Sequence, residues 1–235
     1  MKHTHQIIFI LLALLCSNLL ASALPGRAEV RKIAGTASRI NPAGASSSLA
    51  VGAVLGSGDT ISTGPGSTVD LWLGLNGDWL RLDPDSILKF DVLDIANISE
   101  RRVTTTLHLT RGGVTSNVVN KLTADSKYSI RTAAGIAEIR GTTYAFKSDG
   151  TLIVATGIVN FTYILNGVSK TVTVTARQQF KPGDAAPEAA KRNDLDKIVV
   201  AVATLKDGDG TVTFKGLTVT VTTVENPADV STSGR

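Results

Sequence analysis

The chain has only four cysteine and histidine side chains, and three of them lie among its first 23 residues. The only cysteine, Cys16, and two of the three histidines occur there. His108 is then the one imidazole in the remainder, and no nucleophile elbow lies near it. A Ser-His-Asp triad or a histidine–cysteine metal site therefore lacks the residues that it needs. We expect a protein that is not an enzyme and that holds neither a metal nor a cofactor.

The acidic motifs are better explained by turns than by catalysis. Asp83 and Asp85 flank Pro84, a composition that is typical of a turn. The stretch Asp207-Gly208-Asp209-Gly210 resembles part of a calcium loop, but the later acidic ligand is missing at the required spacing. Neither motif predicts a metal site or the facing carboxylates of a glycosidase.

Two tryptophans and an arginine are the first candidate binding residues. Residues 68–82 alternate between aliphatic and more polar side chains, which predicts a hairpin with one buried face. Asn76-Gly77 fits a two-residue type I′ turn, and this register places Trp72 opposite Arg81 and Trp79 diagonal to Trp72. The outward face could be a stacking platform for a ligand, or a cross-strand pair that covers the hairpin.

Arg140 is the other candidate for binding a partner. It precedes Gly141 within the strand-like segment 136–146, where the glycine predicts a kink or a bulge. A basic residue at such a kink could meet a carboxylate of a partner protein, or it could simply be solvated.

The elements that position these residues are predicted to be strands. The chain has 235 residues and is rich in threonine, valine and glycine, with only 5% aromatic residues. Its formal net charge of +4 is small, so nucleic acid is not an expected partner.

The N-terminus has the pattern of a signal peptide. Lys2 precedes an apolar run from Ile7 to Leu20, and Ala21-Ser22-Ala23 fits the small-x-small cleavage rule. We expect cleavage near Ala23 and a periplasmic or secreted product, with an uncleaved anchor as the alternative. The run is short for a membrane span, and we expect no membrane span in the chain that remains after cleavage.

The remainder reads as consecutive hairpins. Besides residues 68–82, the segment 151–175 forms a strong hairpin around Asn166-Gly167, and a weaker one surrounds Lys215-Gly216. We predict an all-β fold of antiparallel hairpins, either a two-layer sandwich or a solenoid-like stack, with at most one short helix near residues 194–204. The expected organisation is a signal peptide (1–23), a β domain (24–185), a linker (186–192) and a small C-terminal extension (193–235).

Several short motifs, in order, resemble the FecR domain, which is named for the ferric-citrate regulator. They are Gly58-Asp59, Thr63-Gly64, Pro84-Asp85-Ser86, the segment LHLTRGGVTS at 107–116, and Arg140-Gly141-Thr142. The resemblance covers about residues 35–147. Each motif is short, but the ordered set is specific.

The resemblance implies a role in cell-surface signalling. In that family the domain lies outside the inner membrane, contacts an outer-membrane receptor, and relays the signal through a membrane helix to a cytoplasmic anti-sigma segment. Only a few residues precede the apolar run here, so we expect a stand-alone form without that segment.

We therefore expect an exported protein that binds a partner protein of the cell envelope, such as an outer-membrane receptor or a membrane-anchored regulator. Pairing at an exposed sheet edge is one way in which it could do so. The alternative is a glycan- or cell-wall-binding module that uses Trp72, Trp79 and Arg81.

Overall fold

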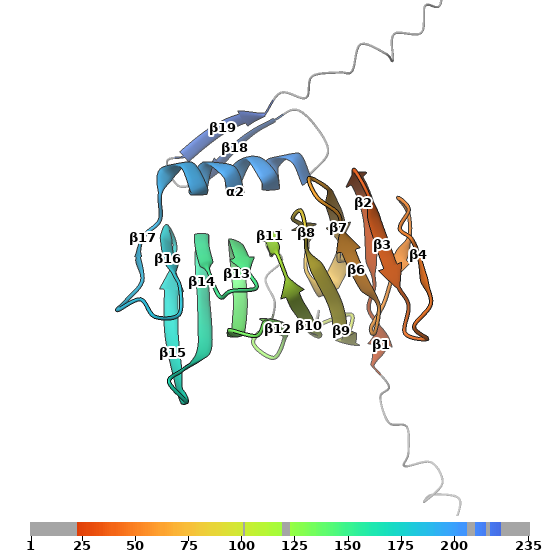
Figure 1. Cartoon of the computed structure of the whole chain (residues 1–235), viewed down its shortest axis with the longest axis horizontal. Helices are drawn as coiled ribbons and strands as arrows, with labels where there is room; N and C mark the ends of the chain where they lie inside the picture. Colours follow the sequence, from red (N-terminus) through yellow and green to blue (C-terminus); the bar gives the residue numbers. More distant parts are fainter. Residues whose placement is uncertain (1–22, 101, 119–122, 206–209, 215–216, 222–235) are drawn as a thin grey trace, which may run out of the picture.

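The computed structural model describes residues 23–100, 102–118, 123–205, 210–214 and 217–221 (Figure 1). Strands predominate, and among these residues the one α-helix is α2 (Arg192–Leu205). The prediction of an all-β fold with one short helix is thereby confirmed. Apart from Ala23, the predicted signal peptide lies outside the described residues, as do the predicted turn at Lys215-Gly216 and residues 222–235.

Strands β1 to β17 form one continuous hydrogen-bonded sheet that curls into two layers, and most neighbours within each layer are antiparallel. The first layer contains β4 (Ser46–Ser48), β3 (Ala37–Ile40), β6 (Thr60–Thr63), β9 (Ile87–Asn97), β10 (Arg102–Arg111), β12 (Lys127–Arg131) and β15 (Val168–Thr175). The second contains β5 (Val54–Leu55), β2 (Ala28–Ala34), β7 (Thr68–Trp72), β8 (Trp79–Leu82), β11 (Gly113–Asn117), β16 (Gln178–Phe180) and β17 (Glu188–Ala189). The short strand β1 (Leu24–Pro25) pairs with β9.

Two long strands belong to both layers. The first half of β13 (Gly135–Lys147) pairs with β12, and its second half pairs with β11. Its neighbour β14 (Leu152–Leu165) pairs with β16 at one end and with β15 at the other. Both strands bend at a glycine with positive φ, Gly141 at 60° and Gly157 at 86°. The chain also passes from one layer to the other at short corners, which lie between β2 and β3, β6 and β7, β8 and β9, and β10 and β11.

The core lies between the layers. Side chains from the second layer, such as Leu71 and Leu80, are fully buried, as are Phe90 and Leu107 from the first. An aromatic cluster fills one end of this core, with ring centroids 5.3–6.3 Å apart, and consists of Phe146, Phe161, Tyr163 and Phe180. The apolar alternation seen in the sequence therefore packs two faces together, which supplies most of the burial free energy.

The hairpin of β14 and β15 agrees with the prediction in detail. Asn166 and Gly167 have φ values of 54° and 77°, as a type I′ turn requires. Leu165 lies opposite Val168, and Phe161 lies opposite Val172. The turn and the alternation specify the same register, so the sequence determines it twice.

The register predicted for the tryptophan hairpin is wrong by two residues. Trp72 lies directly opposite Trp79, and Arg81 lies opposite Asp70. The connection is not a two-residue turn, because η2 (Gly74–Asn76), a short 3₁₀ turn, lengthens it. A shift of two residues keeps each side chain on its predicted face, so the leucines remain buried.

The helix α2 packs on the second layer, where it contacts β8, β11, β13 and β14 (Figure 1). Ile198, Val199 and Val202 point inward and are buried. The hairpin of β18 (Gly210–Phe214) and β19 (Leu217–Val221) lies beside the helix. Within the expected linker 186–192, β17 pairs with β16. In the described part of the chain, no helix has the length and apolar character needed to span a bilayer.

Candidate functional site

The structure does not bring the four candidate residues together. Trp72, Trp79 and Arg81 belong to β7 and β8 in the second layer. Arg140 is the last residue of β13 before that strand leaves the first layer. Two separate surfaces therefore have to be considered.

The tryptophan surface is only partly available to a ligand. Trp72 is 39% exposed, and Trp79 opposite it is half-buried. The guanidinium of Arg81 donates from Nε and Nη2 to the two carboxylate oxygens of buried Asp70, at 2.6 and 2.7 Å. Because this bidentate pair fixes the plane of the guanidinium, Arg81 acts here as a structural partner of Asp70.

A half-buried carboxyl, that of Asp83, lies close to this pair. Burial raises the pKa of Asp83 to about 6, although Arg81 and Lys147 both lower it. The backbone N–H of Asp83 donates to the carbonyl of Gly113 at 3.0 Å, at the corner between β8 and β9. The carboxyl therefore changes its charge in a pH range where ordinary aspartates are fully ionised.

A groove opens on the first layer beside Arg140. The pairing of β12 with β13 ends where Ser129 faces Glu138. Continued by two residues, the same register would place Lys127 opposite Arg140, but no pairing is formed there. The strands separate because β13 bends away at Gly141 towards the second layer. The resulting groove has a volume of about 670 Å³.

The walls of this groove combine charged, polar and apolar groups. They are Ser126, Lys127, Tyr128, Ser129, Glu138, Ile139, Arg140, Gly157, Ile158 and Asn160. Among the described residues, neither Lys127 nor Arg140 has an ion-pair partner. Ile158, opposite Arg140 in β14, is 51% exposed. Arg140 was recognised from its motif, whereas Lys127 was missed because its position depends on how β12 pairs.

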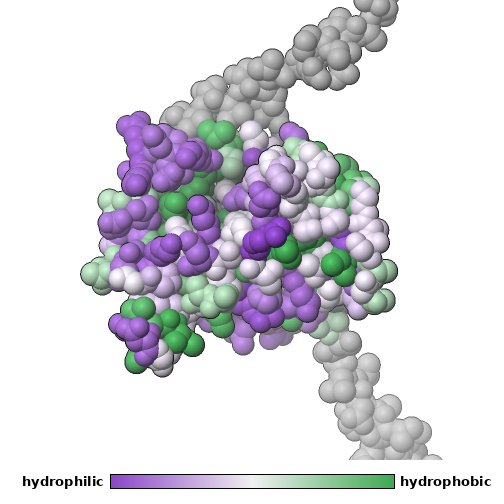
Figure 2. Space-filling view, in the orientation of Figure 1, coloured by the Kyte–Doolittle hydropathy of each residue, from purple (hydrophilic) through white to green (hydrophobic). Residues whose placement is uncertain are grey.

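One free edge of the first layer is β15, and β4 lies at the other end. Within the described residues β15 pairs with β14 on one side, and no strand pairs with its other side. Ile164 and Val168 near the turn are 70% and 58% exposed. In Figure 2 the tip of this hairpin, at the lower left, shows apolar and polar surface side by side.

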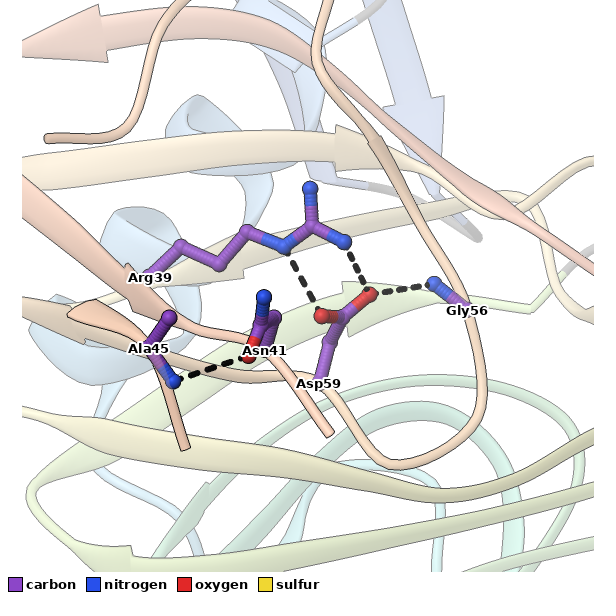
Figure 3. Close-up of polar contacts among 5 residues, drawn as sticks. All are labelled: Arg39, Asn41, Ala45, Gly56 and Asp59. Carbon is purple, nitrogen blue, oxygen red and sulfur yellow. Dashed lines mark hydrogen bonds and ion pairs between the residues drawn. The ribbon is translucent and has the colours of Figure 1, made fainter. Parts of the chain in front are cut away.

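The Gly58-Asp59 motif has a structural role. Asp59 is buried and accepts hydrogen bonds from Arg39 Nε and Nη2, at 2.8 and 2.9 Å, and from the backbone N–H of Gly56 at 2.8 Å (Figure 3). In the adjacent loop, Asn41 Oδ1 accepts from the N–H of Ala45 at 2.9 Å. These contacts hold the turn between β5 and β6 against β3.

The other motif residues tie the corners together. Thr63 Oγ1 donates to the carbonyl of Asp83 at 2.6 Å and accepts from the N–H of Ser86 at 3.0 Å. Ser86 Oγ in turn accepts from the N–H of Gly113 at 2.9 Å. Thr142 Oγ1 lies 2.9 Å from the carbonyl of Ile158. The short motifs therefore mark the places where strands pass between layers.

His108 shows no arrangement typical of catalysis. It is half-buried on β10, opposite Lys89 and beside Arg131 of β12. Burial and the positive charge of Arg131 lower its pKa. Over the described residues, no group of three His, Cys, Asp or Glu side chains could hold a metal ion.

Two solved structures are similar to this chain at low identity. Both are from Parabacteroides distasonis ATCC 8503 and are provisionally described as anti-sigma factors. One is 14% identical, with a TM-score of 0.45, and the match covers 66% of this chain and 67% of that one. The other is 11% identical, with a TM-score of 0.43, and the match covers 70% of this chain and 99% of that one. A search of curated proteins found no match.

The family comparison agrees with the ordered motifs. Residues 59–160 match the model of the family described as FecR protein. That range contains the corner residues Thr63, Ser86 and Thr142, and also Arg140 with its groove. Residues 59–160 of this chain therefore form a FecR domain.

Proposed function

We propose that this protein acts in the cell envelope as a non-enzymatic FecR-domain protein that binds a partner protein and takes part in cell-surface signalling. The FecR family match supports the regulatory role. The predicted signal peptide supports the location. The two similar solved structures are provisionally described as anti-sigma factors, which are also regulatory proteins.

The observation that carries the proposal is the open edge of β15. In an antiparallel hairpin closed by a two-residue turn, alternate residues direct their backbone groups towards the partner strand and away from it. By this alternation, Ser169, Thr171 and Thr173 direct their N–H and C=O groups outward. Thr175 is the next residue in this series, and its N–H donates to Gln178 Oε1 at 2.9 Å and not to β14, as the alternation requires. An extended segment of a partner could therefore add to the sheet as a further strand.

A pair of substitutions tests this edge. Thr171→Pro removes one outward N–H, and proline is tolerated at an edge position whose N–H faces solvent. Thr171→Ala is the matched control, because it removes the same hydroxyl but keeps the N–H. A photoreactive residue at position 173 would crosslink a partner strand in the cell. We expect the crosslinked product to be retained in Thr171→Ala and lost in Thr171→Pro. Equal crosslinking in both variants, with both folded, would contradict strand addition at β15.

The direct pairing of Trp72 with Trp79 supports a second candidate function, a glycan- or wall-binding surface. The double variant Trp72→Ala, Trp79→Ala should then lose retention on cell-wall polysaccharide. Unchanged retention in the double variant would exclude this function.

A further inference from the structure

We propose that the groove between β12 and β13 binds a small acidic sugar, with Arg140 and Lys127 holding its carboxylate. This site lies on the outer face of the first layer, and it uses neither the outward backbone groups of β15 nor the partner protein proposed above. Its geometry follows from one feature, the separation of two strands that are paired further along.

The two cations are the first argument. The register of β12 and β13 directs Lys127 and Arg140 to the two sides of the gap, on the outer face of the first layer. Both side chains are exposed, and neither has an ion-pair partner among the residues that the structure describes. Two like charges across a gap repel each other, and an oxyanion between them would relieve this repulsion. A planar guanidinium is also suited to bidentate binding of a carboxylate.

The rest of the wall favours a polyhydroxylated ligand over a simple anion. One row along from the cations, Ser129, Glu138 and Asn160 lie side by side across β12, β13 and β14. The carboxylate of Glu138 accepts hydrogen bonds only, whereas Asn160, whose Oδ1 already accepts from Thr173 Oγ1 at 2.9 Å, has amide N–H groups that donate. Such a row can bind hydroxyl groups. Glu138 would also repel a ligand that carries negative charge at every position.

An apolar wall completes the site. Ile158 lies opposite Arg140 and is 51% exposed, so it offers a surface for the C–H face of a sugar ring. Next to it, Gly157 has no side chain, and a Cβ there would lie 2.4 Å from the carbonyl oxygen of Gly141. The volume of about 670 Å³ is within the range of small-molecule sites.

Galacturonate is a suitable probe, with glucose and acetate as comparison ligands. Glucose has the hydroxyls without the carboxylate, and acetate has the carboxylate without the hydroxyls. We expect galacturonate to shift the backbone amide NMR signals of β12 and β13 in a saturable way, and to bind more tightly than either comparison ligand. Oligogalacturonate would show whether the natural ligand is a free sugar or a residue within a polymer.

Variants assign the binding to this groove. Because Arg140→Gln removes a charge-assisted hydrogen bond to the carboxylate, it should weaken galacturonate binding about tenfold or more, and Lys127→Gln should also weaken it. Arg140→Lys should retain part of the affinity. The matched control is Arg131→Gln, which removes another exposed cation from β12, one that pairs with Asp91 at 2.6 Å outside the groove.

Three results would overturn the proposal. They are no saturable shift with galacturonate, equal binding of galacturonate and glucose, and equal weakening by Arg131→Gln and Arg140→Gln. Thr171→Pro should leave galacturonate binding unchanged, so failure of the partner-binding function and failure of this site are distinguishable.

Discussion

At the scale of single residues, the polar side chains that distinguish this sequence mostly hold the backbone. Asp59, Thr63 and Ser86 are buried and bond to neighbouring strands. Arg81 is engaged with Asp70. Arg140 differs from them, because its motif forms a corner while its own side chain stays exposed at the groove.

Asp59 should be one of the most sensitive polar residues. Asp59→Ala leaves Arg39 and the N–H of Gly56 without their acceptor, and we expect a loss of about 3 kcal/mol in the free energy of unfolding. Asp149→Ala is the matched control, since Asp149 also accepts from a cation, Lys181, and from a backbone N–H, but at an exposed site. Its loss should be about 1 kcal/mol or less. Urea denaturation measures both, and equal losses would contradict the role of burial.

Asp83 should make stability depend on pH. Its pKa is about 6 in the folded state and near 3.8 when unfolded, so between these values the folded state binds more protons. Stability then falls as pH rises from 3.8 to 6, because a carboxyl that is partly removed from water must ionise. Asp83→Asn removes this cost, so the variant should gain up to roughly 3 kcal/mol relative to the parent protein over that range. Denaturation at several pH values tests this, and a constant difference between the two proteins would contradict it.

At the scale of elements, the two hairpins show what the sequence can and cannot predict. The β14–β15 hairpin was predicted because its turn residues and its alternation agree. The β7–β8 connection was not, because Asn76 is buried there and its amide donates to the carbonyls of Asp94 and Thr104, at 3.1 and 3.2 Å. These partners lie 18 and 28 residues away, so a local turn pattern cannot reveal them.

The corner glycines should differ in their tolerance of a side chain. Gly141 has a φ of 60°, and a Cβ there meets no atom within 4 Å, so Gly141→Ala should cost only the backbone strain of about 1–2 kcal/mol. Gly157 has a φ of 86°, and its Cβ would press on backbone of β13. Gly157→Ala should therefore cost a further 1–3 kcal/mol or so. Thermal unfolding of the two variants gives the comparison, and equal losses would contradict the close approach at Gly157.

At the scale of the whole molecule, the two layers have different surroundings. The helix α2 covers part of the second layer, and all five residues of β11 are buried. The first layer keeps an exposed face, on which Ile136 and Ile158 are 47% and 51% exposed. The sequence predicted the helix from its apolar spacing. It could not show which layer the helix covers, since that depends on contacts between distant segments.

Docking of α2 can be tested with two neighbouring valines. Val202 is buried against the second layer, whereas Val200 is 42% exposed. Val202→Asp should destabilise the protein by about 3 kcal/mol or more, because it places a charge in an apolar contact. Val200→Asp should change stability by about 0.5 kcal/mol or less. Hydrogen exchange of the β11 amides should rise in the first variant only, and similar exchange in both would contradict docking of the helix.

The bent strands also bear on how the chain folds. A bent strand, or two consecutive strands joined at a corner, forms a unit that belongs to both layers. Each such unit pairs mainly with the unit before it and the unit after it, so both layers extend together along the sequence. Such a chain can fold progressively from its N-terminus, with each new strand adding to a complete two-layer edge. The barrier to folding should therefore be set by closing one loop at a time, and not by an initial search for pairings between the two ends of the chain.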